Sequence, residues 1–149
     1  MGSALDVVRE AYEHYRHGRL DAVLEACADD VAWRSIGPAA DIPWTGDYRG
    51  RDAVRGWFEM LGGHISVESY DIRRFIAQDE WVVVLSDVTA RFKRGGPSVQ
   101  FDKCDVMRVA DGKIVEFVEF FDTAAVKKLL EGGGTMLAYS AEPVAASLV

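Results

Sequence analysis

The spacing of hydrophobic residues divides the chain into a helical first part and a strand-rich second part. In the first part, apolar residues recur every three to four positions, which is typical of helices with one buried face. Leu5, Val8, Tyr12 and Tyr15 form the first such stripe. The predicted helices cover residues 4–17, 20–28, 51–61 and 124–130. Gly18 and Gly62-Gly63 are expected to end the first and third helices, and Thr123 to cap the last.

From residue 66 onward the period changes to two, which indicates β-strands. The predicted strands cover residues 31–35, 66–76, 81–93, 99–109 and 113–121. The last four are joined by short connections, including a tight Asp111-Gly112 turn, and this predicts an antiparallel meander. Segment 36–50 is rich in glycine and proline and is predicted to be a loop.

The order of these elements predicts an α+β fold. We expect a cone-shaped barrel in which a curled antiparallel sheet wraps around the N-terminal helices and leaves an apolar interior for a small molecule. Residues 1–131 are assigned to this single domain, and residues 132–149 to a C-terminal tail of small and apolar residues.

Composition and charge exclude several classes of function. The net charge of −7, with basic residues scattered along the chain, argues against nucleic-acid binding. No apolar run approaches 20 residues and no signal peptide begins the chain, so we expect a cytoplasmic protein that does not enter membranes. Cys27 and Cys104 lie far apart, which fits free thiols. His14 and His17 lack a third ligand, so neither a metal nor another cofactor is expected.

Two acidic residues interrupt otherwise apolar strands and are the first candidates for chemistry. Asp105 and Glu119 lie on the two strands that flank the Asp111-Gly112 turn. A carboxyl group facing an apolar interior has a raised pKa and can carry a proton near neutral pH. The alternative is that both acids face water, or that Asp105 is a structural partner to Lys103 or Arg91. A regular two-residue turn would place Asp105 opposite Val118, so a shared face requires a β-bulge or a different loop length.

A third acid and a set of large apolar side chains complete the candidates. Asp87 lies within the strand predicted over residues 81–93. Aromatic residues are frequent around the predicted hollow, where they serve either as cavity walls or as ordinary core. The residues assigned to substrate binding are Trp33, Trp44, Tyr48, Trp57, Met107 and Phe117.

Several short motifs occur in an order that resembles a known superfamily. They are GRLD at 18–21, ADDVAW at 28–33, GDYRGRDAV at 46–54, DGKIV at 111–115 and FFDT at 120–123. The set resembles the SnoaL-like branch of the ketosteroid isomerase and nuclear transport factor superfamily. The resemblance implies the cone-shaped α+β fold and a homodimer paired through the outer face of the sheet. It leaves function open, since this fold hosts enzymes and non-enzymes.

The resemblance to ketosteroid isomerases is incomplete at the catalytic positions. Asp105 matches the acid that donates a hydrogen bond to the oxyanion. The general base falls on Ser35, and the oxyanion tyrosine falls on Ala11. Tyr12 is adjacent, but on a helix it points about 100° away. Steroid isomerisation is therefore not expected.

Two other branches match at Glu119. In SnoaL-type polyketide cyclases this position holds the pocket aspartate, and the histidine of the neighbouring strand matches Asp105. In limonene epoxide hydrolases it holds the acid that activates water. Their second aspartate falls near Asp87 and the arginine two residues earlier on Leu85. The residues that hold the water fall near Trp33 and Ser35.

Three functions follow from these observations. The first is a cofactor-free enzyme in which Glu119 moves a proton and Asp105, in protonated form, steadies an oxygen of a small apolar carbonyl compound during isomerisation, cyclisation or hydration. The second is a dimeric binding module for a small apolar ligand. The third is a protein-interaction domain, for which the sequence nominates no surface.

Overall fold

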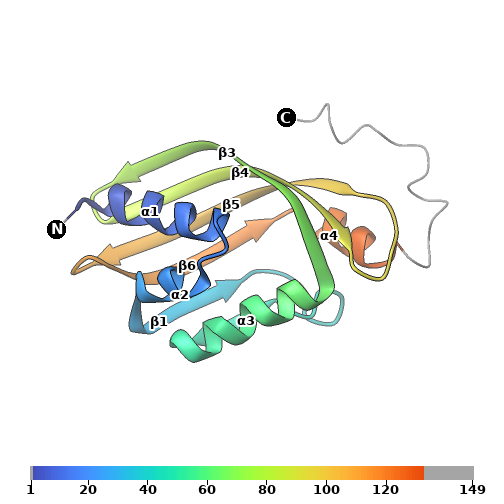
Figure 1. Ribbon diagram of the computed structural model, residues 1–149, viewed down its shortest axis with the longest axis horizontal. Helices are drawn as coiled ribbons and strands as arrows, with labels where there is room; N and C mark the ends of the chain where they lie inside the picture. Colours follow the sequence, from blue (N-terminus) through green and yellow to red (C-terminus); the bar gives the residue numbers. More distant parts are fainter. Residues whose placement is uncertain (1, 133–149) are drawn as a thin grey trace.

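The computed structural model describes residues 2–132, and the predicted tail from residue 133 onward lies outside the described residues. The described residues form four helices and six strands in an α+β arrangement, as the hydrophobic pattern predicts (Figure 1). The helices are α1 (Ala4–Arg16), α2 (Leu20–Glu25), α3 (Arg51–His64) and α4 (Thr123–Leu130). The strands are β1 (Cys27–Ser35), β2 (Gly46–Arg49), β3 (Ile65–Gln78), β4 (Trp81–Phe92), β5 (Val99–Ala110) and β6 (Lys113–Phe121).

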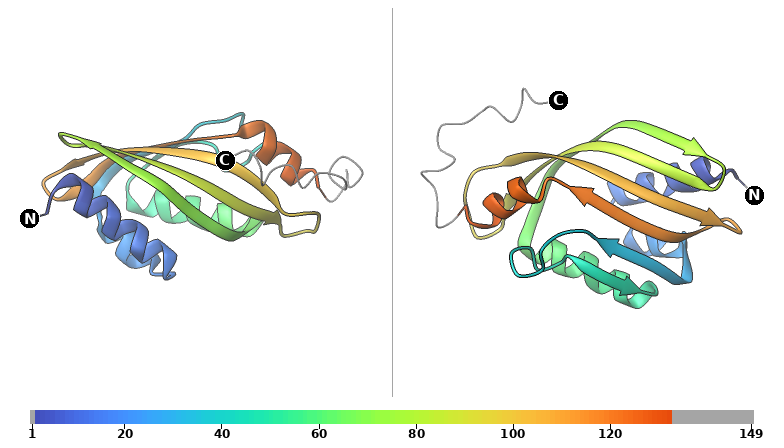
Figure 2. Two further views of the ribbon diagram at one scale, coloured as in Figure 1. Left: turned by 90° about the horizontal axis from the view of Figure 1, so that it is seen from above. Right: turned by 180° about the vertical axis from the view of Figure 1, so that it is seen from behind.

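All six strands belong to one sheet in the order β2-β1-β6-β5-β4-β3. Strands β1 and β6 are parallel, and the other neighbours are antiparallel. The sheet curls without closing, and α1, α2 and α3 lie against its concave face, while α4 packs at one end (Figure 2). The apolar faces of the helices and the inward side chains of the strands form one core, which confirms the predicted cone.

Several boundaries differ from the sequence prediction. Strand β1 begins at Cys27 rather than residue 31 and pairs with β2, which lies within the segment predicted to be a loop. Helix α3 continues through Gly62 and Gly63 to His64. Each glycine weakens a helix by about 1 kcal/mol, but the buried Val54 and Trp57 anchor α3 against the sheet.

The N-terminus of α4 is also set by a different residue from the one predicted. The cap is Asp122, whose carboxylate accepts a hydrogen bond from the Ala125 amide at 3.0 Å. Thr123 is the first helical residue. Both residue types cap helices, and an aspartate additionally favours the positive end of the helix dipole.

The hairpin between β5 and β6 contains a β-bulge, one of the two features that would bring Asp105 and Glu119 to a shared face. Asp111 and Gly112 both have positive φ angles, 52° and 74°, as in a two-residue type I′ turn. The pairing then shifts, because Val109 faces Ile114 whereas Arg108 faces Glu116, and Val115 is the extra residue. Beyond this bulge Asp105 lies directly opposite Glu119. Both acids therefore point to the concave face.

None of the described helices is long and apolar enough to span a membrane.

Candidate active site

The concave face of the sheet encloses a cavity of about 800 Å³, counting its open mouth. Its walls come from α1, α3 and the inward side chains of β1, β4, β5 and β6, and they are mostly apolar. Polar groups enter it from α1, β3, β5 and β6. The polar lining residues include Tyr12, Tyr15, Tyr70, Lys103, Asp105 and Glu119. An apolar hollow with a few converging polar groups is typical of small-molecule sites.

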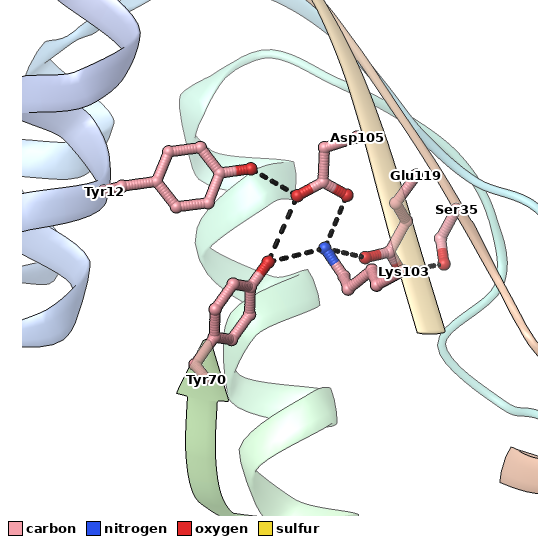
Figure 3. Close-up of polar contacts among 6 residues, drawn as sticks. All are labelled: Tyr12, Ser35, Tyr70, Lys103, Asp105 and Glu119. Atoms are coloured by element: carbon pink, nitrogen blue, oxygen red, sulfur yellow. Dashed lines mark hydrogen bonds and ion pairs between the residues drawn. The ribbon is translucent and has the colours of Figure 1, made fainter. Parts of the chain in front are cut away.

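Lys103 is at the centre of the polar groups. Its Nζ atom lies 2.5 Å from Asp105 Oδ1 and 3.1 Å from Glu119 Oε1 (Figure 3). It also donates to the hydroxyl oxygen of Tyr70 at 3.1 Å. The lysine side chain is only 13% exposed, and the carboxylate side chains are 1% and 3% exposed. One buried ammonium thus links two buried carboxyl groups on adjacent strands.

Asp105 accepts hydrogen bonds at both oxygens. Oδ1 accepts from Lys103, while Oδ2 accepts from the hydroxyls of Tyr12 and Tyr70, the latter at 3.2 Å (Figure 3). Three donors converge on one carboxylate, so its contacts are those of an acceptor. The sequence analysis assigned Asp105 as a protonated donor to a substrate oxygen. This arrangement instead gives it the role of counterion to Lys103.

Glu119 is buried as well but has fewer donors. Ser35 Oγ donates to its Oε2 at 2.5 Å, and Lys103 contacts its Oε1. Burial raises the pKa of Glu119; the nearby Lys103 charge opposes this shift, and the Asp105 charge adds to it. Glu119 is therefore the group of the cluster that holds a proton above the ordinary carboxyl range.

The neighbouring groups keep their protons. Burial alone would lower the pKa of Lys103, but the charge of Asp105, with Tyr70 and Glu119, raises it well above the usual lysine value. Burial and the Asp105 charge likewise raise the pKa values of Tyr12 and Tyr70. With Lys103 charged and Asp105 paired to it, the cluster is neutral when Glu119 is protonated, which fits its apolar surroundings.

Most of the predicted wall residues line the cavity, namely Trp33, Trp44, Trp57, Met107 and Phe117. Trp33 stacks on Phe117 with ring centroids 3.7 Å apart, and Trp57 meets Trp33 edge-on. Tyr48 is not part of the lining; its hydroxyl donates to the Trp44 carbonyl at 2.8 Å and braces the segment before β2.

Asp87 lies on the opposite face of the sheet from the cavity. It pairs across the strands with Asp71 and Asp102, and its carboxylate lies 3.4 Å from Arg73 Nε. Burial raises its pKa first, and the neighbouring Asp102 adds to that rise. The structure therefore separates Asp87 from Asp105 and Glu119, and it brings only the latter two together.

Sequence reasoning missed Tyr12 and Tyr70 as members of the site, and it considered Lys103 only as a structural partner of Asp105. Tyr12 was set aside because Ala11 occupies the matching family position, yet its hydroxyl reaches Asp105. Lys103 had a usable signal, because it lies two residues before Asp105 and so shares its face of β5. The resemblance to epoxide hydrolases placed a basic residue two positions before Asp87 on β4, where this chain has Leu85. The same spacing occurs instead on β5, between Lys103 and Asp105.

The described residues 2–132 contain no group of three or more histidine, cysteine or acidic side chains that could hold a metal ion.

Comparison with known proteins agrees with the fold. The family model for the SnoaL-like domain matches residues 8–117. An NTF2-like protein of unknown function from Burkholderia pseudomallei is 28% identical, with a TM-score of 0.78 over 87% of this chain and 98% of that chain. No match was found among curated proteins.

Two more distant structures share the fold. An LEH-like epoxide hydrolase from M. tuberculosis is 23% identical, with a TM-score of 0.67 over 91% of this chain and 95% of that chain. A candidate SnoaL-like polyketide cyclase from Mesorhizobium loti is 19% identical, with a TM-score of 0.66 over 80% of this chain and 99% of that chain. Likeness at this identity concerns the fold alone. The family match, which spans most of the described residues, is the stronger finding, and the chain belongs to the SnoaL-like domain family.

Proposed function

We propose that this protein is a cofactor-free enzyme that moves a proton at a small, mostly apolar substrate bearing a carbonyl group. The observation that supports this best is the placement of Glu119, which is 3% exposed, lines the cavity and lies between Lys103 and Ser35. A carboxyl group in such surroundings exchanges protons near neutral pH. The apolar walls suit a hydrophobic substrate body.

In the proposed reaction, ionised Glu119 removes a proton from the carbon next to the carbonyl and later returns it at another position. Lys103 stabilises the ionised form of Glu119, and Ser35 fixes the orientation of its carboxyl group. Asp105 holds Lys103 in place and balances its charge. Isomerisation and aldol-type cyclisation both need such a group, which acts first as base and then as acid.

Water addition is the second candidate, because one observation favours it specifically. A basic residue lies two positions before Asp105 and links that acid to Glu119, the arrangement that the resemblance to epoxide hydrolases led us to seek on β4. Glu119 would then take a proton from water as the water oxygen bonds to a carbon of a strained ring and the ring C–O bond breaks. The released ring oxygen would take the proton back from Glu119, which gives the diol. Ser35 lies near a position that holds the water in those enzymes, and here its hydroxyl donates to Glu119.

The test is proton exchange with the Glu119→Gln variant. Purified protein is incubated in D₂O with a panel of small ketones, and loss of the proton signal next to the carbonyl is followed by NMR. Epoxides are screened in parallel for diol formation. The wild type should accelerate one of these reactions, and Glu119→Gln should lower the rate by about 100- to 10,000-fold while keeping its circular dichroism spectrum.

Two results would overturn the proposal. Equal rates in wild type and Glu119→Gln would remove Glu119 from the chemistry. If ketones bind to the wild type without proton exchange, and no epoxide of the panel gives a diol, the binding module is favoured instead. Glu116→Gln is the matched control, because Glu116 lies on the same strand but pairs with Arg108 at the surface.

A second copy of the chain is the proposed partner for the outer face of the sheet. Val83, Val106 and Val118 pair side by side across β4, β5 and β6 on that face. Ile76, Trp81 and Phe120 are all more than 40% exposed. A contiguous apolar strip of this kind favours association with another protein surface.

A further inference from the structure

The cavity contains three tyrosine hydroxyls, and two of them are already engaged. Tyr12 donates to Asp105 Oδ2, and so does Tyr70, which also accepts from Lys103. Tyr15 lines the same cavity, but its hydroxyl has no hydrogen-bond partner within the described part of the chain. The Tyr15 hydroxyl oxygen is not fully enclosed by protein atoms, so it is accessible. Tyr15 is thus the phenol that is free to donate to a bound molecule.

The position of Tyr15 is fixed by its neighbours. It is on α1 one helical turn after Ala11, so both side chains lie on the helix face that meets the cavity. Its ring packs edge-on against Tyr70, with centroids 5.8 Å apart, and lies tilted against Phe58, with centroids 5.9 Å apart. The Tyr15 ring therefore lies one aromatic ring away from the Lys103–Asp105 pair and has little freedom to turn.

Tyr15 also marks the place where the inner cavity meets a second hollow. This outer recess lies between the end of α1, the end of α3 and the start of β3. The residues common to both spaces are Tyr15, Phe58, Leu61, Ile65 and Val67. A ligand entering from the recess would pass the Tyr15 hydroxyl before it reaches Glu119.

The chemistry of Tyr15 suits a donor. Burial raises its pKa, Lys103 opposes that shift, and the charges of Glu119 and Asp105 add to it. The phenol therefore keeps its proton at neutral pH. A donor left without a partner in an apolar cavity favours a ligand that supplies an acceptor there.

We infer that the Tyr15 hydroxyl donates a hydrogen bond to an acceptor oxygen of the substrate, at the point where the inner cavity opens into the outer recess. This inference rests on the proposed function for the use of the cavity as the substrate site. It defines the ligand as an apolar molecule that carries a carbonyl or similar acceptor oxygen, in preference to a pure hydrocarbon of the same shape.

The test compares two probes, acetophenone labelled with ¹³C at the carbonyl and ethylbenzene, which has a similar shape but no oxygen. In the wild type the bound carbonyl signal should shift downfield, as hydrogen bonding requires, and acetophenone should bind more tightly than ethylbenzene. Tyr15→Phe should move the signal upfield and weaken acetophenone binding by about 3- to 10-fold without changing ethylbenzene binding. Tyr48→Phe is the matched control, since its hydroxyl donates to the Trp44 carbonyl and it does not line the cavity, and it should keep the carbonyl shift.

Three outcomes would overturn the inference: no preference for acetophenone in the wild type, an unchanged carbonyl signal in Tyr15→Phe, or an equal loss in Tyr48→Phe. Nuclear Overhauser contacts between the probe and the Tyr15 ring provide a second measurement that needs no substitution, and their absence would also contradict it. Because the readout is binding, failure of Glu119 to transfer protons would leave these results unchanged. The two proposals can therefore fail separately.

Discussion

Asp105 and Glu119 face each other across β5 and β6, and both contact the ammonium of Lys103. A single positive charge can balance only one of the two carboxylates. All three side chains are buried, so keeping the second carboxylate ionised in the apolar cavity costs free energy. Protonation of that carboxylate removes the cost. The cluster thus favours one protonated carboxyl group, and the raised pKa of Glu119 indicates that this group is Glu119.

The first prediction concerns the pH dependence of stability. Burial raises the pKa of Glu119 in the folded state above its value of about 4.3 in the unfolded chain. Stability from this group is fully present below the unfolded pKa and is lost as pH rises through the folded pKa. Glutamine at position 119 has no carboxyl group to ionise. The free energy of unfolding of Glu119→Gln should therefore fall less than that of the wild type between about pH 4 and about pH 7. Urea unfolding at a series of pH values measures this difference. Parallel curves would contradict it, and Glu116→Gln, at the surface of β6, should follow the wild type.

The second prediction concerns the bridging lysine. Lys103→Met leaves Asp105 and Glu119 close together in the cavity without a cation. Removing one partner of a buried ion pair costs about 3–5 kcal/mol. Adding Asp105→Asn to Lys103→Met should recover part of that loss.

Denaturant unfolding of the single and double variants measures this coupling. Arg108→Met is a suitable control, since Arg108 is on the same strand and pairs with Glu116 and Glu80 at the surface. Its loss should stay within about 1 kcal/mol. Equal losses for the two substitutions would show that the lysine is not a buried bridge.

The third prediction concerns the link between α1 and the sheet. The Tyr12 hydroxyl donates to the Asp105 carboxylate, and a hydrogen bond to a charged group contributes about 1.5–3 kcal/mol. Tyr12→Phe should destabilise the protein by that amount. In an Asp105→Asn background the same change should cost less, because the charge is gone. A double-mutant cycle by thermal or urea unfolding measures the coupling, and identical costs in both backgrounds would contradict a direct bond.

The fourth prediction concerns the outer face. Phe120 is 47% exposed there, next to the apolar strip across β4, β5 and β6. If a second copy covers this face, Phe120→Asp should convert a dimer to a monomer in sedimentation experiments over a range of concentrations. Met60 on α3 is 39% exposed and lies away from the strip, so Met60→Asp should leave the association state unchanged. A monomeric wild type would rule out this partner.

The sequence predicts most of the fold because long elements carry a clear hydrophobic period. The stripe of Val8, Tyr12 and Tyr15 predicts α1, and the alternation in β4 through β6 predicts the meander. Strand β2 was missed because four residues are too few to show a period. Such short strands are defined by pairing with β1, which local sequence does not reveal.

The candidate site was predictable only in part. Glu119 and Asp105 were found because a charged residue within an apolar strand can be recognised in the sequence. Their shared face depends on the bulge at Val115. Residue spacing alone shows that the hairpin cannot be regular, but it shows neither the kind of irregularity nor its position. Both faces of β4 carry apolar residues, so alternation could not show that Asp87 points away from the cavity. Contacts between α1 and β5 arise only on folding, and this explains why Tyr12 was missed.

The bulge at Val115 has a consequence for how this cavity can change. In a regular hairpin of the same sequence, Val118 would lie opposite Asp105, and Phe120 would turn inward while Glu119 turned outward. A slip of one residue near the turn would thus remove Glu119 from the cavity and leave Lys103 and Asp105 there as a simple ion pair, with every strand still in place. The proposed proton carrier therefore depends on a single extra residue in β6.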